Sequence, residues 1–230
     1  VAPWPAAKEG AWVGTPGMNA PIRAMADALG AQFDTRIEAI ERSGAGWRLV
    51  GNGAPGETFD AVVVAVPAEQ AAPLLDPHCP SSGELAHWVG SAPCWAALVA
   101  FESRVDAPDT LSDIGPIAWA ARDSAKPGRD GHLECWVVHG SADWSREHLE
   151  YPRADVLAML LDHFAAQAGP LPQVATAVVH RWRYAMVKKN DLGALWEPQT
   201  GLGACGDWLS GPRVENAFLS GLALSRLVGR

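Results

Sequence analysis

The sequence predicts an α/β fold with mixed α+β character, in which a second domain carries a mixed or antiparallel sheet. The run Ala61–Val66 consists of small and β-branched residues and ends at Pro67, which is typical of a buried parallel strand. Apolar residues at helical spacing mark Arg153–Ala168 as a long helix. Between these segments, short apolar runs such as Cys94–Phe101 are separated by polar connections, as in an antiparallel meander.

Length and composition are those of a globular protein. The chain has 230 residues, of which 48% are hydrophobic and 19% charged, so it can bury a core without disulfides or metals. The net charge of -8 is spread without basic or acidic blocks, and no apolar run of about 18 residues is present. Nucleic acid and membranes are therefore not expected as partners.

The first third of the chain predicts one helix followed by short strands. Apolar residues recur at helical spacing over Met18–Leu29, and Ala31–Arg42 alternates as a half-exposed strand does. Trp47–Val50 and Glu57–Phe59 flank a turn containing Asn52-Gly53, which favours a hairpin. The strand Ala61–Val66 then follows.

A short surface helix is expected next, over Glu69–Leu75, with Pro73 and Pro77 ending it. From Ser81 to about Val179 the pattern changes to strands with polar connections, which indicates the second domain. Further elements are expected in the remaining segments: strands at Pro116–Ala121, His132–His139 and Gln173–Tyr184, and a strand, a loop and a closing helix over Gly201–Arg230.

The four cysteines do not form a metal-binding or disulfide-rich pattern. Cys79, Cys94, Cys135 and Cys205 are 15, 41 and 70 residues apart. We interpret them as buried thiols of a protein in the reducing cytoplasm.

Two literal GxGxxG stretches, Gly51–Gly56 and Gly201–Gly206, are not expected to bind a dinucleotide, because neither follows a strand and opens a helix. GxSxG and HExxH motifs are absent, so neither a serine hydrolase nor a zinc peptidase is indicated, and no metal site is expected.

The segment Ala204–Ala217 contains residues that could bind a ligand. Gly206 would let the backbone approach a ligand closely, and the carboxylate of Asp207 can accept hydrogen bonds from sugar-like hydroxyls. The helix after Pro212 would present free N–H groups that favour negative charge. A capped loop before an ordinary terminal helix explains the same residues equally well on physical grounds.

This tail resembles the C-terminal FAD-binding motif of the flavin amine oxidase superfamily, in which an Ala-Gly-Asp-like triplet precedes a Val-Glu-x-Ala helix. The similarity is closer to the renalase-like branch of NAD(P)/FAD-dependent oxidoreductases. Three segments carry this closer similarity: His180–Ala185, Cys205–Trp208 and Arg213–Phe218. Two further segments, Gly14–Ala20 and Val64–Pro67, resemble the family's Gly-Met segment and the strand that closes its nucleotide domain. The family's own GxGxxG unit is not found in this chain, so the sequence resembles a fragment without the first βαβ unit.

The resemblance implies FAD as the cofactor and a division into domains. Residues 1–80 and 200–230 would form the remaining part of a Rossmann-like FAD-binding domain, and residues 81–199 an inserted substrate-binding domain. Carried over by motif, the residues expected to bind the cofactor are Ile37, Gly206, Asp207, Arg213, Val214 and Glu215.

In relatives the substrate pocket is walled by apolar and aromatic residues. The residues expected there are Trp182 and Tyr184, with Trp95, Trp119 and Trp136 as further candidates. Most of the 11 tryptophans are expected to fill the core. No catalytic acid or base is assigned, since hydride transfer to a flavin can proceed without a strong general base.

The resemblance therefore implies a cytoplasmic FAD-dependent oxidoreductase. It would transfer a hydride from an amine-like or dihydronicotinamide-like small-molecule donor to flavin N5, with dioxygen as the final acceptor. The alternative is a catalytically inactive fragment or binding module, because the dinucleotide phosphate site is missing from the sequence.

Overall fold

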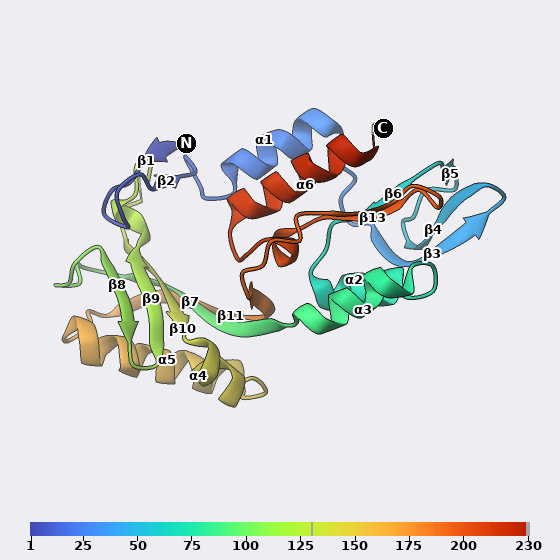
Figure 1. Cartoon of the computed structure of the whole chain (residues 1–230). Helices are drawn as coiled ribbons and strands as arrows, with labels where there is room; N and C mark the ends of the chain where they lie inside the picture. Colours follow the sequence, from blue (N-terminus) through green and yellow to red (C-terminus); the bar gives the residue numbers. More distant parts are fainter. Residues whose placement is uncertain (130, 229–230) are drawn as a thin grey trace. The chain divides into compact units, whose positions relative to one another are not determined.

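A computed structural model describes residues 1–129 and 131–228, which form two compact units. Unit 1 comprises Val1–Ala31 and Pro93–Arg183, and unit 2 comprises Gln32–Ala92 and Tyr184–Arg230 (Figure 1). The mixed α/β class with antiparallel and mixed sheets is as the sequence predicts. None of the described helices is long and apolar enough to cross a membrane.

Unit 1 is built on a five-stranded sheet with the order β11-β7-β10-β9-β8. The strands are β7 (Ser91–Phe101), β8 (Thr110–Ile114), β9 (Ile117–Arg122), β10 (Glu134–Gly140) and β11 (Val174–Val187). The pairings of β10 with β7 and β9, and of β8 with β9, are antiparallel. The unit also contains β1 (Ala2–Pro3), β2 (Trp12–Val13), α1 (Ala20–Leu29), η1 (Asp123–Ala125), α4 (Ala142–Glu147) and α5 (Arg153–Ala168).

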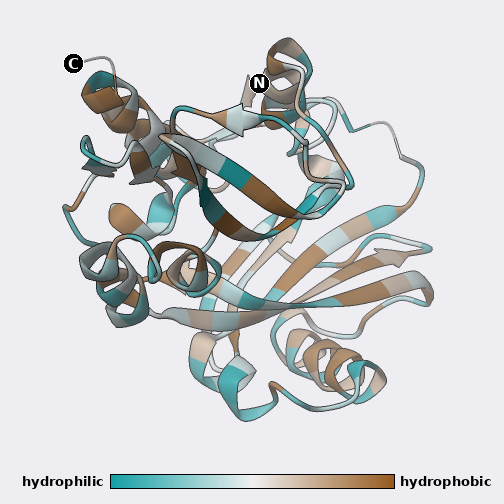
Figure 2. Cartoon of the chain, turned by 90° about the vertical axis from the view of Figure 1, so that its right-hand side faces the viewer, coloured by the Kyte–Doolittle hydropathy of each residue, from teal (hydrophilic) through white to brown (hydrophobic). Residues whose placement is uncertain are grey.

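Helix α5 covers one face of this sheet (Figure 1). Its buried residues Val156, Leu160 and Phe164 follow the 3.6-residue period, and Phe164 packs on Trp136 of β10 with ring centroids 5.0 Å apart. Hydrophobic stretches run along the strands in Figure 2. The sequence predicted this helix with the bounds that the structure shows.

The buried guanidinium of Arg122 fastens the end of β9 to its neighbours. It is 1% exposed, pairs with Glu134 of β10 and with Asp109 at 2.7 Å, and donates to the carbonyl oxygens of Val105 and Ala107 at 3.1 and 2.6 Å. A buried charge requires such partners. These bonds hold the β7–β8 connection against β9 and β10.

Unit 2 contains two three-stranded sheets. One is antiparallel, with β3 (Arg36–Ser43), β4 (Gly46–Asn52) and β5 (Thr58–Phe59). In the other, β13 (Leu202–Ala204) pairs in parallel with β6 (Val62–Val64) and antiparallel with β12 (Leu195–Glu197). The remaining elements are α2 (Ala68–Leu75), α3 (Pro80–Val89), η2 (Asp207–Leu209) and α6 (Val214–Val228).

Most expected elements of unit 2 are present, and two details are corrected. The strand within Ala61–Val66 is parallel, but among the described strands it lies at a sheet edge, and Val63 is 45% exposed, so it is not buried on both faces. Pro73 lies inside α2 and does not end it. Ala68, Ala72 and neighbouring residues of that helix are buried, and this packing offsets the cost of the proline.

Several short elements were not predicted, namely β1, β2, α3, β8, η1, α4, β12 and η2. The buried face of α3 includes Gly83 and Ala86, which give little hydrophobic contrast. Helix α4 has six residues and is capped by the side chain of Ser141, which accepts a hydrogen bond from Trp144 N. Such elements depend on packing more than on local pattern.

The two units divide the chain elsewhere than at the expected domain limits of 1–80, 81–199 and 200–230. Residues 1–31 belong to unit 1, where Trp4 and Val13 pack with Ala121, and unit 2 resumes at Tyr184. The expected closing segment extends to Arg230, of which the last two residues lie outside the described ones. The division into a cofactor-binding and a substrate-binding domain stays a prediction.

All four cysteines are free thiols. Cys205 is buried, whereas Cys79, Cys94 and Cys135 are half-buried, so the expectation of four buried thiols is correct for Cys205 alone. Burial raises the pKa of the Cys94 thiol to about 11, which keeps it protonated at neutral pH.

Replacing Leu160 by Ala should lower the free energy of unfolding by about 2–5 kcal/mol, because the fully buried side chain leaves a cavity under the sheet. Gln167→Ala on the exposed side of α5 is the matched control and should change it by less than about 0.5 kcal/mol. Urea unfolding monitored by circular dichroism measures both. Equal effects of the two substitutions would contradict the packing of α5.

Candidate functional site

The connection from β13 to α6 in unit 2 contains most of the residues expected to bind a cofactor. β13 is fully buried, and its end is fixed where Cys205 N–H donates to the carbonyl of Val64 at 3.1 Å. Gly206 N–H donates to Ser220 Oγ of α6 at 3.0 Å, and that hydroxyl donates to Gly193 O at 2.5 Å. The loop is therefore tied to both the strand before it and the helix after it.

Gly206 occupies a backbone conformation that requires glycine. Its φ is +154°, and a Cβ atom there would lie 2.8 Å from the ring of Trp208. The Trp208 side chain is fully buried, and its indole N–H has no hydrogen-bond partner among the described residues. Because residue 206 is a glycine, no side chain covers the backbone where the chain turns toward α6.

Asp207 follows in η2 with its side chain half-buried. Burial raises the pKa of its carboxyl, and the backbone N–H groups of Trp208 and of Asp207 itself oppose that rise. Its backbone carbonyl accepts bonds from Ser210 N at 2.9 Å and Gly211 N at 2.6 Å. A carboxylate in this position can accept hydrogen bonds from hydroxyl groups of a ligand.

Helix α6 begins directly after this loop. The side chain of Val214 is 72% exposed, and Ala217 N–H donates to Arg213 O at 3.1 Å in the first helical turn. The N–H groups before Ala217, which include those of Val214 and Glu215, have no helical acceptor, so the helix presents partial positive charge here. Arg213 and Glu215 are also exposed.

The remaining expected cofactor residue, Ile37, lies in β3 opposite Gly51, next to a bulge between Ile37 and Ala39. It belongs to the other sheet of unit 2. The structure therefore places Gly206, Asp207, Arg213, Val214 and Glu215 on one continuous loop and helix start, and Ile37 apart from that segment.

The two GxGxxG stretches do not open a helix, as expected. Gly51–Gly56 lies at the end of β4 and in the turn to β5, and Gly201–Gly206 contains β13 and leads into η2. Neither therefore has the strand–turn–helix context of a dinucleotide fingerprint.

Unit 1 holds a cavity of about 670 Å³ on the sheet face opposite α5. Side chains alternate along each strand, so Leu98, Val137 and Val178 face the cavity while their neighbours pack against α5. Its lining is mainly apolar and includes Gly17, Met18, Leu98, Val99, Ala100, Trp119, Cys135, Trp136, Val137, Thr176, Ala177 and Val178.

The polar part of the lining is formed by Asp123, Lys126, Arg129 and His139. Lys126 Nζ lies 2.7 Å from Asp123 Oδ1, and Arg129 Nε lies 3.2 Å from Asp123 Oδ2. Burial raises the pKa of the Asp123 carboxyl, but hydrogen bonds and charge from Lys126 and Arg129 more than offset it, so this pKa lies below its ordinary value. The carboxyl is therefore charged at neutral pH.

His139 faces the same cavity, with its ring centroid 5.4 Å from that of Trp119. Burial and the charge of Lys126 both lower the pKa of the imidazole. The pKa of the neighbouring Cys135 thiol is raised by burial and by Asp123. At neutral pH the imidazole and the thiol are thus both uncharged.

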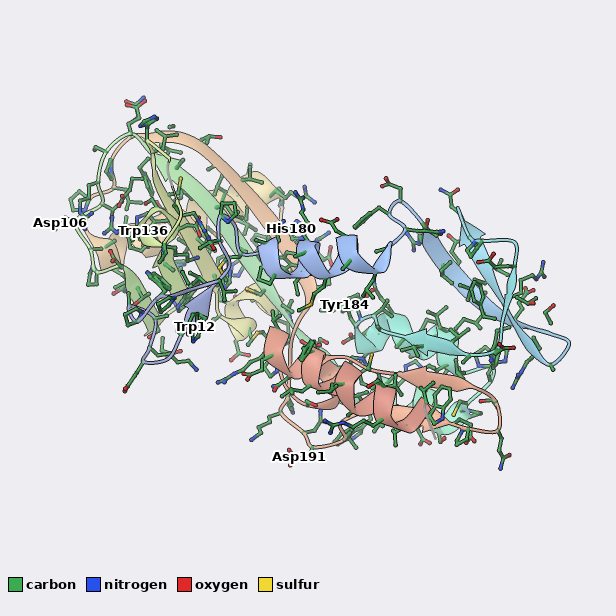
Figure 3. The ribbon with its side chains drawn as sticks, turned by 90° about the horizontal axis from the view of Figure 1, so that it is seen from above. Trp12, Asp106, Trp136, His180, Tyr184 and Asp191 are labelled. Carbon is green, nitrogen blue, oxygen red and sulfur yellow. The ribbon has the colours of Figure 1, made fainter. Side chains whose placement is uncertain are left out.

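Trp182 and Tyr184, expected to line a substrate pocket, lie on β11 and are 55% and 42% exposed. They share the strand face of Thr176 and Val178, because even-numbered residues of β11 point the same way, but they do not line the cavity. Trp182 packs on His180, with ring centroids 4.3 Å apart. Figure 3 labels His180 and Tyr184 on this strand. Tyr184 is the first residue of β11 that belongs to unit 2.

Of the further tryptophan candidates, Trp119 and Trp136 belong to the cavity lining. The side chains of Trp136 and Trp95 are each 1% exposed and belong to the core under α5. The sequence analysis missed the cluster of Asp123, Lys126 and Arg129. The available signal was three charged residues in a Pro- and Gly-containing turn directly after an apolar strand.

Comparisons with known proteins cover both units of the chain. Residues 6–228 match the model of the flavin containing amine oxidoreductase family. A protein provisionally assigned as a protoporphyrinogen oxidase from Exiguobacterium sp. 255-15 has a TM-score of 0.70 at 14% identity over 93% of this chain and 51% of its own. Cyclohexylamine oxidase from Brevibacterium oxydans IH-35A also gives 0.70, at 14% identity over 93% of this chain and 54% of its own.

An oxidoreductase from Methanosarcina mazei has a TM-score of 0.64 at 14% identity, over 91% of this chain and 54% of its own. The chain thus spans about half the length of these structures. At this level of identity the likeness concerns the fold.

Gly206→Ala should destabilise the protein by about 1–3 kcal/mol, because the added Cβ meets the Trp208 ring in a strained conformation. Gly221→Ala in α6 is the matched control. A Cβ at Gly221 would meet nothing within 4 Å, and alanine should stabilise the helix by about 1 kcal/mol. Thermal unfolding of the two variants measures both signs, and a stable Gly206→Ala protein would contradict the loop geometry.

Asp123→Asn should make stability less dependent on acid pH. The folded-state pKa of Asp123 lies below its ordinary value of 3.8, so its contribution is complete above that value and is lost as the pH falls through the folded-state pKa. The variant should be less stable than the wild type at neutral pH, and the difference should shrink as the pH falls through the folded-state pKa.

Asp143→Asn, whose side chain is 96% exposed, is the control for this titration. Urea unfolding at a series of pH values measures the difference. A gap between Asp123→Asn and wild type that stays constant with pH would rule out the ion pairs as its source.

Proposed function

Because the chain belongs to the flavin containing amine oxidoreductase family, we propose that the whole protein is an FAD-dependent oxidoreductase. The observation that carries the proposal is the β13–α6 connection, where a required glycine, a half-buried carboxylate and a free helix start follow one another. When bound, FAD supplies the atom that accepts a hydride from the donor. The protein contributes binding and orientation.

Within this proposal the bare backbone at Gly206 permits close approach of the cofactor. Asp207 would accept hydrogen bonds from hydroxyl groups of FAD, and Arg213 at the start of α6 would also bind the cofactor. The N–H groups of Val214 and Glu215 would hold the flavin ring and would stabilise negative charge on it. Ile37 is proposed to lie at the adenine.

The proposed donor is a small amine-like or dihydronicotinamide-like molecule, and dioxygen is the proposed final acceptor. We place the protein in the renalase-like branch because of the segments His180–Ala185 and Arg213–Phe218, with Trp182 and Tyr184 at the substrate pocket and a cytoplasmic location. Two electrons and one hydrogen pass from the donor as hydride, and dioxygen with a further proton takes them up as hydrogen peroxide.

A second proposal concerns the 230-residue chain taken alone, which spans about half the length of its structural relatives. It would be a binding module that does not retain FAD. Titration of FAD into the purified chain, followed by flavin fluorescence, separates the two proposals. Binding in the micromolar range or tighter would overturn the module proposal.

The protein produced from the complete gene should carry the visible absorbance of a flavin after purification or after refolding with FAD. Asp207→Ala should weaken FAD retention about tenfold or more, because hydrogen bonds to a charged group are lost. Asp191→Ala, on an exposed residue of the same unit, is the control and should keep full occupancy. The ratio of visible to protein absorbance measures occupancy, and a flavin-free wild type would overturn the proposed function.

A further inference from the structure

We propose that the cavity of unit 1 binds an apolar, aromatic molecule that carries one carboxylate, with the ammonium group of Lys126 as the partner of that carboxylate. As a binding site this stands on unit 1 alone. As the substrate class of an oxidoreductase it rests on the proposed function.

The size and lining of the cavity define the body of the ligand. About 670 Å³ is the range of pockets that hold small organic molecules. Leu98, Val137 and Val178 line it with apolar groups, and the ring of Trp119 offers a flat face against which an aromatic ring can pack. The body of the ligand is therefore apolar and aromatic.

The charges in the lining define the polar end of the ligand. Among the described residues that line the cavity, two cations, Lys126 and Arg129, share the single carboxylate of Asp123, which leaves one positive charge in excess. Arg129 also donates to the backbone carbonyls of Gly14 at 3.0 Å and of Pro16. Its donors are thus largely used within the protein.

Lys126 differs from Arg129 because, within residues 1–129 and 131–228, not all of its donors are used. The residue is 6% exposed, and among the described residues its ammonium group makes one hydrogen bond, to Asp123 at 2.7 Å. An ammonium group has three N–H donors. The rings of Trp4 and Trp119, 5.4 and 6.0 Å from Nζ, stabilise the charge without accepting a conventional hydrogen bond.

A buried cation with free donors favours an anion that reaches it. His139 does not add a second charge, since burial and Lys126 lower the pKa of its imidazole, and it can contribute a neutral hydrogen bond. A protonated amine would meet Lys126 as a like charge. The cavity therefore disfavours a protonated amine and favours a ligand with an anionic group.

Three naphthalene compounds of similar shape test the charge. 2-Naphthylacetate is anionic, 2-naphthylacetamide is neutral and 2-(2-naphthyl)ethylamine is cationic, and each is titrated by calorimetry into the 230-residue chain without FAD. 2-Naphthylacetate should bind at least tenfold more tightly than the amide, and the amine should bind most weakly of the three. Equal affinities for all three, or binding of none of them, would overturn the proposal.

Lys126→Met should lower the affinity for the acetate at least tenfold and leave that for the amide within about twofold. Lys8→Met, on an exposed lysine of the same unit, is the control and should change neither. An unchanged preference for the acetate in Lys126→Met would overturn the assignment of Lys126.

A second variant covers the case in which Lys126→Met does not fold. Val178 is 63% exposed and lines the cavity, so Val178→Asp places a negative charge there. This variant should bind 2-naphthylacetate more weakly and 2-(2-naphthyl)ethylamine more tightly. Val174→Asp, on the same strand face outside the cavity lining, should have the smaller effect. The opposite order would overturn the proposal.

These titrations are independent of the flavin. Binding of 2-naphthylacetate by a protein that carries no flavin would support the cavity site and overturn the oxidoreductase proposal. A protein that carries flavin but binds the three compounds equally would support the oxidoreductase proposal and overturn the cavity site.

Discussion

The parallel pairing of β6 with β13 is the contact on which unit 2 depends. It joins Val62–Val64 to Leu202–Ala204, two segments separated by the whole of the chain that forms most of unit 1. The pairing fixes where the chain leaves β13, and Cys205 N–H continues it by donating to Val64 O. The loop at Gly206 and the start of α6 follow within a few residues, so the geometry of the candidate cofactor site depends on this non-local contact.

Unit 1 uses the two faces of its sheet differently. One face packs against α5 through Trp136, Leu160 and Phe164, and supplies the hydrophobic free energy of the unit. The other face contributes the wall of the cavity and ends at the cluster around Asp123. Because side chains alternate along each strand, the residues that stabilise the unit and those available to a ligand are neighbours in sequence. Function can therefore vary on one face while the core is kept.

The elements with strong local patterns were predicted closely. Helix α5 has the expected bounds because its apolar positions follow the helical period, and the hairpin at Asn52-Gly53 follows from turn chemistry. The buried tryptophans were also expected, although the sequence did not indicate that Trp95 packs in the core while Trp119 lines the cavity. The face that a strand residue presents is decided by which helix covers the sheet, and that contact is non-local.

The sequence by itself determined the fold class, the long helix and the candidate cofactor-binding residues from Gly206 to Glu215, because these depend on local periodicity and on neighbouring residues. Only the tertiary structure decided that Val62–Val64 lies at a sheet edge and that the ammonium of Lys126 is buried in an apolar cavity beside Asp123 and His139. Those features arise where strands and loops distant in sequence meet, and the burial that gives their charges energetic weight exists only after the chain has packed.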